Sequence, residues 1–162
     1  MMRMRPQIAV VGAGEAGAEL LATGEQVGAR LAEAGALLVC GGLGGVMEAA
    51  CRGAREAGGL TVGLLPGTDR RTANPFLDVA VPTGMGEMRN ALVVRAGEAV
   101  IAVGGGFGTL AEIALALKAR TPVVGISTCE GARTGRAIEV ERVESAAEAV
   151  DRALALAQAQ RR

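Results

Sequence analysis

The stretch Ala99–Glu112, AVIAVGGGFGTLAE, decides the fold. Its first five residues are all apolar, which is typical of a strand buried on both faces of a parallel sheet. Glycines follow, and over Thr109–Ala119 the apolar residues recur at helical spacing. A strand, a glycine turn and a helix in this order form the repeating unit of open α/β sheets. The sequence therefore predicts an α/β fold.

The same alternation of apolar runs and helical patterns extends in both directions. The expected strands are Gln7–Val11, Ala36–Cys40, Leu60–Leu65, Leu77–Val81, Ala99–Val103 and Val123–Ile126, with a last edge strand at Ala137–Val140. The expected helices are Ala18–Ala34, Val46–Ala57, Met85–Ala96, Thr109–Ala119 and Ser145–Gln160, and we expect Cys129–Arg136 to be mobile. With no linker or internal repeat, residues 1–162 are predicted to form a single Rossmann-like nucleotide-binding domain. We expect it to have three layers, α/β/α, around a mainly parallel sheet of about six or seven strands.

The first of three glycine clusters, Gly12-Ala-Gly14-Glu-Ala-Gly17, matches the pattern GxGxxG directly after a strand. The dinucleotide fingerprint also requires an acidic residue at the end of the second strand, where it binds the ribose. Here that strand ends in Val39-Cys40-Gly41, so the acid is missing. The sequence does not predict an NAD-dependent dehydrogenase.

The second and third clusters, Gly41–Gly45 and Gly104–Gly108, each open a predicted helix. Helix N-termini present unpaired N–H groups and a partial positive charge, and glycine lets a phosphate approach them closely. Glycines also make tight turns without any ligand, but two clusters at equivalent places favour ligand binding. The candidate phosphate-binding residues are Gly12, Gly14, Gly41, Gly42, Gly44, Gly45, Gly104, Gly105, Gly106, Phe107, Gly108 and Thr109. The motif GxxxxGK[ST] is absent, which argues against P-loop ATP hydrolysis.

Two charged residues near the third cluster have alternative explanations. Thr109 and Glu112 have the spacing of a capping box, which would explain the glutamate structurally. An acid beside a phosphate-binding helix start is electrostatically unfavourable unless it has a function. Arg89 precedes the third cluster and would reach a phosphate or Glu112, or else be a surface arginine. The same alternatives apply to Glu48, in the first turn after the second cluster, although there the helix dipole favours the structural explanation.

Composition excludes several kinds of chemistry. The chain has no His, Trp or Tyr, which removes imidazole-based catalysis and His-bound zinc, and no other pattern predicts a metal or a cofactor. It has 17 basic and 17 acidic residues, a balance that does not predict nucleic-acid binding. Three cysteines without a CxxC pair fit a reducing cytoplasm, and no apolar run has the length of a signal peptide or a membrane span.

Two of the predicted helices, Met85–Ala96 and Thr109–Ala119, carry apolar residues on more than one side. A helix that is apolar most of the way round is buried on two sides. A thick core would explain this, but we favour an interface between subunits. The sequence thus predicts a homodimer or a higher homo-oligomer.

The motif MGEMRN at Met85–Asn90, followed by AVIAVGGGFGTLAE, resembles the paired motifs of the "lonely guy" (LOG) phosphoribohydrolases and so-called lysine decarboxylases. LLVCGGLGGVMEAACRGAREAGGLTVGLLPG resembles the second glycine loop and third strand of these proteins, and the likeness covers about residues 7–127. The motif's proline is Gly104 here, its lysine is Asn90, and Glu48 stands where glycine is usual. These departures make the chain similar to an uncharacterised bacterial branch and to the molybdenum-cofactor carrier proteins.

The resemblance implies two functions. As in LOG enzymes, Arg89 and Glu112 would be catalytic in the hydrolysis of a nucleoside 5′-monophosphate to free base and ribose 5-phosphate. Alternatively, the chain would be a non-catalytic carrier or sensor of a phosphorylated cofactor or nucleotide. Met85, Met88 and Asn90 are candidate contacts of the base or ligand, together with the loop Pro66–Pro75. A pyridoxal-phosphate decarboxylase is rejected, because the one lysine, Lys118, lies far along its helix from the glycines. A purely structural domain is the third alternative.

Overall fold

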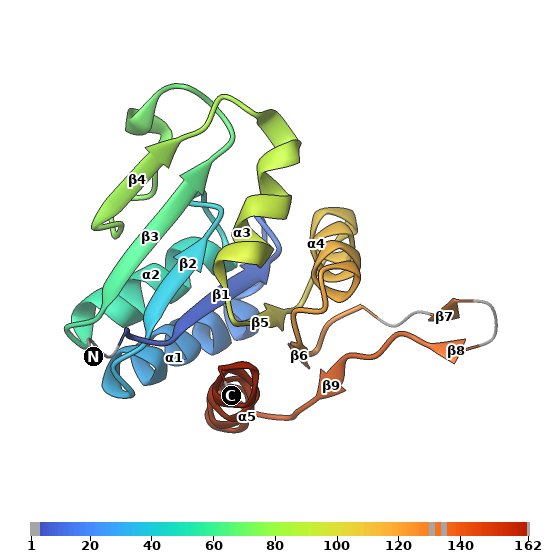
Figure 1. The fold of residues 1–162 in the computed structure, drawn as a ribbon. Helices are drawn as coiled ribbons and strands as arrows, with labels where there is room; N and C mark the ends of the chain where they lie inside the picture. The colour runs from blue at the N-terminus through green and yellow to red at the C-terminus, as the bar shows by residue number, and fades with distance from the viewer. Residues whose placement is uncertain (1–3, 130–131, 134–135, 162) are drawn as a thin grey trace.

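A parallel sheet forms the middle layer of the computed structural model, which describes residues 4–129, 132–133 and 136–161 (Figure 1). Within these residues the sheet has seven strands in the order β4-β3-β2-β1-β5-β6-β9, and every neighbouring pair is parallel. The strands are β1 (Gln7–Gly12), β2 (Leu37–Cys40), β3 (Leu60–Leu65), β4 (Val79–Pro82), β5 (Ala99–Val103), β6 (Val123–Ile126) and β9 (Glu141–Arg142). The predicted Rossmann-like α/β fold is confirmed.

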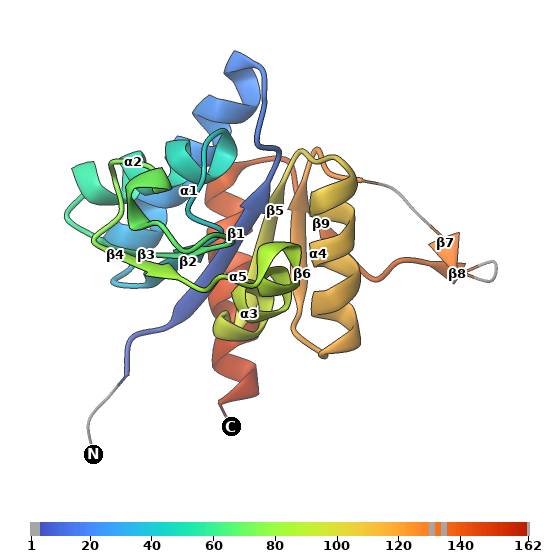
Figure 2. The same ribbon diagram turned by 90° about the horizontal axis from the view of Figure 1, so that it is seen from above.

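Helices cover both faces of the sheet (Figure 2). One face carries α1 (Ala18–Glu33), α2 (Val46–Glu56) and α5 (Ala146–Gln160), and the other carries α3 (Asn90–Ala96) and α4 (Phe107–Lys118). Alternate residues of β1 point to opposite faces, so that Ile8 packs in the first layer and Ala9 in the second. Both faces are apolar because both are covered, which explains the continuously apolar strands.

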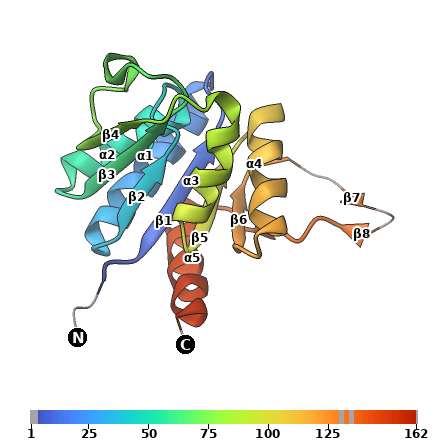
Figure 3. The same cartoon turned by 45° about the horizontal axis from the view of Figure 1, so that its top comes forward.

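The strand order reverses between β1 and β5, since β2, β3 and β4 lie on one side of β1 and β5, β6 and β9 on the other. All the strands run in the same direction, so the loops that follow β1, β2, β3 and β5 meet at one edge of the sheet. The start of β1 and the end of α5 lie at the opposite edge (Figure 3). Open α/β sheets bind their ligands at such a reversal point.

The helices α1 and α2 pack with almost no space between their backbones. A Cβ atom added to Gly28 of α1 would lie 1.8 Å from the carbonyl oxygen of Ala50 in α2. One added to Gly53 of α2 would lie 2.0 Å from the carbonyl oxygen of Glu25 in α1. These glycines are needed for packing.

Three elements differ from the prediction by more than one residue at their start or in the type of helix, and several others differ by one residue at an end. The fourth strand begins at Val79 and not at Leu77. The helix predicted over Met85–Ala96 is a 3₁₀ turn, η2 (Gly86–Arg89), followed by α3, because Gly86 has a φ of +57° that an α-helix does not accommodate. The helix α4 begins at Phe107, two residues before the predicted start.

The last predicted strand, Ala137–Val140, is wrong. Ala137 pairs in a short antiparallel hairpin of β7 (Ala132–Arg133) and β8 (Arg136–Ala137), which stands away from the body of the protein (Figure 1). Ile138 and Val140 pack against the core without joining the sheet, and the edge strand is formed by the next two residues. Of the segment predicted to be mobile, residues 130–131 and 134–135 lie outside the described residues. No described helix is both long and apolar enough to cross a membrane.

Candidate functional site

A cavity of about 360 Å³ lies where the strand order reverses. Its walls come from the loops after β1, β2, β3 and β5, from η2 and from the first turns of α2 and α4. A larger surface hollow of about 480 Å³ over α1 and α2 does not bring these loops together. The cavity contains one arginine and two glutamates, Arg89, Glu87 and Glu112.

The first turn of α4 forms one wall of the cavity through Gly106, Gly108 and Thr109. Gly106 is the N-cap residue in extended conformation, and no side chain caps the helix. Among the described residues, no protein acceptor is found for the N–H groups of Phe107, Gly108 or Thr109. A helix start with free N–H groups and a partial positive charge is an anion-binding site, so this wall suits a phosphate.

Glu112 is not explained by a capping box. That prediction is wrong because α4 begins at Phe107, which places Thr109 inside the first turn and Glu112 beyond the reach of the N-cap. The Glu112 side chain lies in the cavity wall and is only 7% exposed. Burial raises the pKa of its carboxyl to about 7, and the positive charge of Arg89 partly opposes this shift.

Arg89 is buried and is not a surface arginine, since it is 7% exposed. Its Nη2 donates to the carbonyl oxygen of Gly41 at 3.4 Å, and its Nη1 donates to Oδ1 of Asn90. Its Nε is buried and has no hydrogen-bond partner within the described part of the chain. No ion pair joins Arg89 to Glu112 among the described residues, so the guanidinium is held by Gly41 and Asn90, and these two bonds leave its Nε–H donor unused.

Gly12 and Gly14, after β1, line the cavity as predicted for binding residues. The second glycine loop contributes Leu43 instead of its glycines, although Met47 of α2 also reaches the wall. Gly41 lies against Arg89, where a Cβ atom would come within 2.8 Å of Nη2.

The other predicted glycines lie behind or beside the cavity. Gly42 packs against Leu65 and Gly63, Gly104 against Leu20, and Gly105 against Thr109 and Cys129. Gly45, with a φ of +67°, lies in a neighbouring hollow of about 410 Å³ with Gly14 and Glu48, and Gly44 lies next to the Glu48 carboxylate.

The predicted ligand contacts Met85 and Met88 lie outside the cavity wall, at 42% and 74% exposure, whereas Asn90 lines it. Phe107 is 93% exposed and also lies outside the wall. No aromatic ring therefore lines the cavity among the described residues, and Leu43, Met47 and Pro66 supply its apolar surface.

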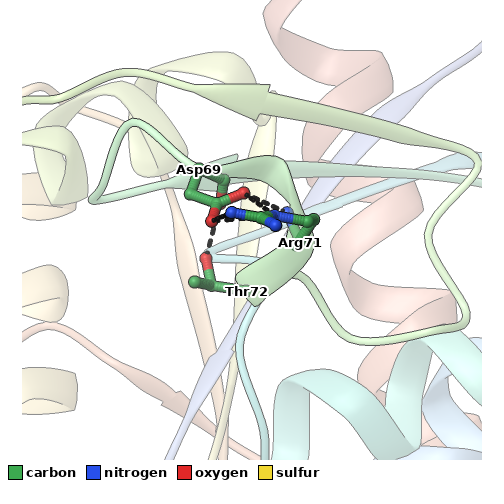
Figure 4. Close-up of polar contacts among 3 residues, drawn as sticks. All are labelled: Asp69, Arg71 and Thr72. Carbon is green, nitrogen blue, oxygen red and sulfur yellow. Dashed lines mark hydrogen bonds and ion pairs between the residues drawn. The ribbon is translucent and has the colours of Figure 1, made fainter.

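The loop of residues 66–75 is braced by its own side chains (Figure 4). The Asp69 carboxylate accepts hydrogen bonds from the Arg71 backbone N–H at 2.9 Å and from Nη2 of Arg71 at 2.8 Å. The Thr72 hydroxyl donates to the Asp69 carbonyl oxygen at 2.8 Å. Pro66 is the residue of this loop that lines the cavity, and the Arg71 guanidinium is engaged by Asp69.

Sequence reasoning missed Asn74, which joins this loop to the second glycine loop. Its backbone N–H donates to the Gly42 carbonyl oxygen at 2.9 Å, and its Nδ2 donates to the Leu43 carbonyl oxygen at 3.1 Å. The dipeptide Asn74-Pro75 is a turn signal that could have drawn attention to it. Glu87 and Ala13 of the cavity wall were also missed, and nothing in the sequence distinguishes them.

The remaining chemical groups do not form a second centre near the cavity. Lys118 ends α4 at the far end from Gly106. No group of three or more Cys, Asp or Glu side chains suited to a metal ion is found in the part of the chain that the structure describes. Below the second glycine loop, the Cys40 and Cys51 thiols share a buried hydrogen bond with an Sγ–Sγ distance of 3.5 Å.

Comparison with known proteins agrees with the fold and with the suspected branch. The sequence profile of the SLOG cluster4 family matches residues 5–158. An uncharacterized protein of Archaeoglobus fulgidus is 48% identical over 112 residues, which is 69% of this chain and 74% of that protein.

Two solved structures are similar over nearly the whole chain. The molybdenum cofactor binding protein of Rippkaea orientalis is 32% identical, with a TM-score of 0.87 over 96% of this chain and 99% of that one. The Moco carrier protein of Chlamydomonas reinhardtii is 34% identical, with a TM-score of 0.82 over 97% of this chain and 99% of that one.

Proposed function

The chain belongs to the SLOG cluster4 family, and we propose that its cavity binds the phosphate group of a phosphorylated small molecule. The observation that carries the proposal is the start of α4, where three N–H groups have no acceptor among the described residues and the first turn borders a cavity that also holds a buried arginine. Phosphate is an anion with several acceptor oxygens, and both features stabilise it. The formal net charge of zero favours a small ligand over a nucleic acid.

We further propose that the chain is a carrier that holds a phosphorylated cofactor or nucleotide without cleaving it. The similar proteins of Rippkaea orientalis and Chlamydomonas reinhardtii, which bind or carry the molybdenum cofactor, support this. The arrangement of Arg89 also supports it, because both terminal nitrogens already bind Gly41 and Asn90. An arginine fixed in this way is suited to bind an anion in one position. It is less suited to move toward negative charge that forms in a transition state.

Hydrolysis of a nucleoside 5′-monophosphate is the second candidate, and Glu112 is the observation that favours it. A carboxyl whose pKa is raised to about 7 lies in the same cavity as the proposed phosphate site. Such a pKa suits a general acid or base near neutral pH. In this reaction a water oxygen would bond to C1′ of the ribose as the bond from C1′ to the base nitrogen breaks. The base would take up the proton.

A base-release assay separates the two candidates. Wild type and Glu112→Gln are incubated with a panel of nucleoside monophosphates, and free base is measured by chromatography while binding is measured by calorimetry. Glu48→Gln is the matched control, because Glu48 is also in the first turns of a helix but lies outside the cavity wall. Binding without release supports the carrier, and release that Glu112→Gln alone abolishes supports the hydrolase. Absence of both binding and release across nucleotides and phosphorylated pterins would refute the proposal.

The homo-oligomer also stays a proposal. Met85, Met88, Leu92 and Phe107 are large apolar side chains that are 38–93% exposed. They come from η2, α3 and the start of α4, the region whose apolar helices predicted an interface. Analytical ultracentrifugation of wild type and Met88→Glu tests it: we expect an oligomer that the variant weakens, and a monomeric wild type would refute it.

A further inference from the structure

We propose that Asn74 is a positioning residue that turns the N–H groups of Leu43 and Gly44 in the second glycine loop toward the ligand in the cavity. The inference rests on the proposed function, because it assumes that an anion occupies this cavity. It gives the second glycine loop a role that its glycines alone do not explain, since Leu43 is the loop residue that lines the cavity.

Asn74 is held tightly although it lies in a loop. It is a polar residue of only 7% exposure. Its side chain bonds in two directions: Nδ2 donates to the Leu43 carbonyl oxygen at 3.1 Å, and Oδ1 accepts from the Phe76 N–H at 3.1 Å. With its backbone bond to the Gly42 carbonyl oxygen at 2.9 Å, this residue binds two consecutive carbonyl groups of the glycine loop.

These two hydrogen bonds fix the orientation of two peptide groups. In a trans peptide the C=O bond and the N–H bond of the next residue point in opposite directions. The Gly42 carbonyl is directed to the Asn74 backbone, so the N–H of Leu43 is directed away from Asn74. The Leu43 carbonyl is directed to the Asn74 side chain, and so the N–H of Gly44 is directed away as well.

Neither N–H group has a partner within the protein. Among the described residues, no acceptor is found for the N–H of Leu43 or of Gly44, whereas the neighbouring N–H of Gly42 contacts Cys40 Sγ at 3.3 Å and that of Val46 donates to the Ala13 carbonyl oxygen. Two successive free N–H groups form a small anion-binding concavity. In this proposal the ligand meets donors on two walls: the start of α4 and the loop that Asn74 holds, of which Leu43 lines the cavity and Gly44 lies next to it in the chain.

The side-chain amide allows a pH test that a general effect on folding would not reproduce. In Asn74→Asp, the new carboxyl is buried and faces the Leu43 carbonyl oxygen, and both features raise its pKa above the usual value of about 3.9. The protonated acid at low pH then still donates to the Leu43 carbonyl oxygen, but the carboxylate at high pH has no donor and repels it. Asn74→Ala has no donor at any pH. Asp69→Asn is the matched control, because it makes the reverse exchange in the same loop, and among the described residues the hydrogen bonds of the Asp69 side chain stay within that loop.

The experiment measures AMP affinity by calorimetry at pH 5.5 and pH 8, with each variant compared with wild type at the same pH. We expect Asn74→Asp to bind about tenfold more weakly at pH 8 and within about threefold of wild type at pH 5.5. Asn74→Ala is expected to be weakened at both values, and Asp69→Asn at neither. NMR of labelled wild type is expected to show AMP-dependent shifts of the Leu43 and Gly44 amides as well as of those at Gly106–Thr109.

The outcomes separate this inference from the proposed function. If AMP shifts only the amides at Gly106–Thr109, or if Asn74→Asp loses the same affinity at both pH values, the positioning role is overturned and the phosphate site stands. If wild type binds no nucleotide of the panel, no phosphorylated pterin and no inorganic phosphate, both are overturned. Urea denaturation of each ligand-free variant ensures that affinity is compared only where the protein is folded.

Discussion

Glycines at the α1–α2 crossing and glycines around the cavity look alike in the sequence but have opposite surroundings. A Cβ atom added to Gly28 or Gly53 would overlap the backbone of the facing helix. One added to Gly14, Gly106 or Gly108 would have no heavy atom of a described residue within 4 Å, apart from its chain neighbours and the backbone of its own helix. In the first region, the backbone of the facing helix occupies the place that a side chain would take. In the second the space is empty within the protein and is available to a ligand.

The second glycine loop belongs partly to each region. A Cβ atom on Gly45 would lie 2.3 Å from the Ala13 carbonyl oxygen, and Gly45 has a φ of +67°, so this glycine is required for packing and for the turn. Leu43, two residues earlier, lines the cavity. A glycine cluster is therefore not a binding signal in itself, and each of its residues has to be assigned from its surroundings.

The largest effect is expected where the facing helix fills the space that a side chain on the glycine would need. Gly28→Ala places a Cβ atom 1.8 Å from the Ala50 carbonyl oxygen, so the helices must separate. We expect a loss of about 4 kcal/mol in the free energy of unfolding, despite the better helix propensity of alanine. Urea denaturation measures it. Gly14→Ala is the control, for which we expect less than about 0.5 kcal/mol. Equal stability of the two variants would remove the distinction between the regions.

The second-largest effect concerns Glu112, because ionising this buried carboxyl lowers the free energy of unfolding. The pKa of its carboxyl is about 7 in the folded protein and 4.5 by reference, so between these values the folded state binds the extra proton. The stability that the protonated Glu112 contributes is then fully present below pH 4.5, and it is lost as the pH rises through 7. The loss amounts to about 3 kcal/mol.

Glu112→Gln removes this titration. Relative to wild type, we expect the variant to gain up to about 3 kcal/mol on going from pH 5 to pH 8, measured by urea denaturation at both pH values. Glu48→Gln provides the control for a general charge effect, because that carboxylate is outside the cavity wall. A difference between Glu112→Gln and wild type that does not change with pH would contradict the buried acid.

The fold was predictable because its signals are local. Apolar runs such as Val100–Val103 and the Ser145 cap of α5, which accepts from the Glu148 N–H, depend on neighbouring residues alone. The start of α4 was misplaced because Phe107 and Gly108 have low helix propensity, which tertiary structure overrides here. The edge strand was misplaced because Val140 is apolar without pairing in the sheet.

The candidate site was predictable only in part. The motifs named Arg89 and Glu112, but the burial of each depends on how η2 and α4 lie against the sheet, which spacing does not specify. Asn74 acts on a loop 31 residues earlier in the chain, a contact that no local pattern encodes. The apparent capping box at Thr109 was a coincidence of spacing that only the observed helix start could expose.

A smaller effect is expected from Gly106→Ala, which tests the empty space directly. Gly106 has a φ of −133° that alanine adopts without strain, and among the described residues only its chain neighbours lie within 4 Å of the added Cβ. The free protein is expected to keep its melting temperature. The affinity for AMP is expected to fall about tenfold, because the added methyl group occupies part of the cavity that the ligand would fill. Unchanged affinity in calorimetry would show that no ligand approaches this residue.

The smallest effect is expected from Gly108→Ala, which should separate stability from binding. Gly108 is in the first turn of α4 with open space around it, so alanine is expected to raise the free energy of unfolding by about 0.5 kcal/mol. The same methyl group lies at the cavity wall and is expected to weaken AMP binding about threefold. Urea denaturation and calorimetry on one preparation measure both. A variant that is more stable and binds as well as wild type would mean that this glycine is not kept for the ligand. Only the open space at Gly14 and Gly106 would then remain as a candidate for ligand binding.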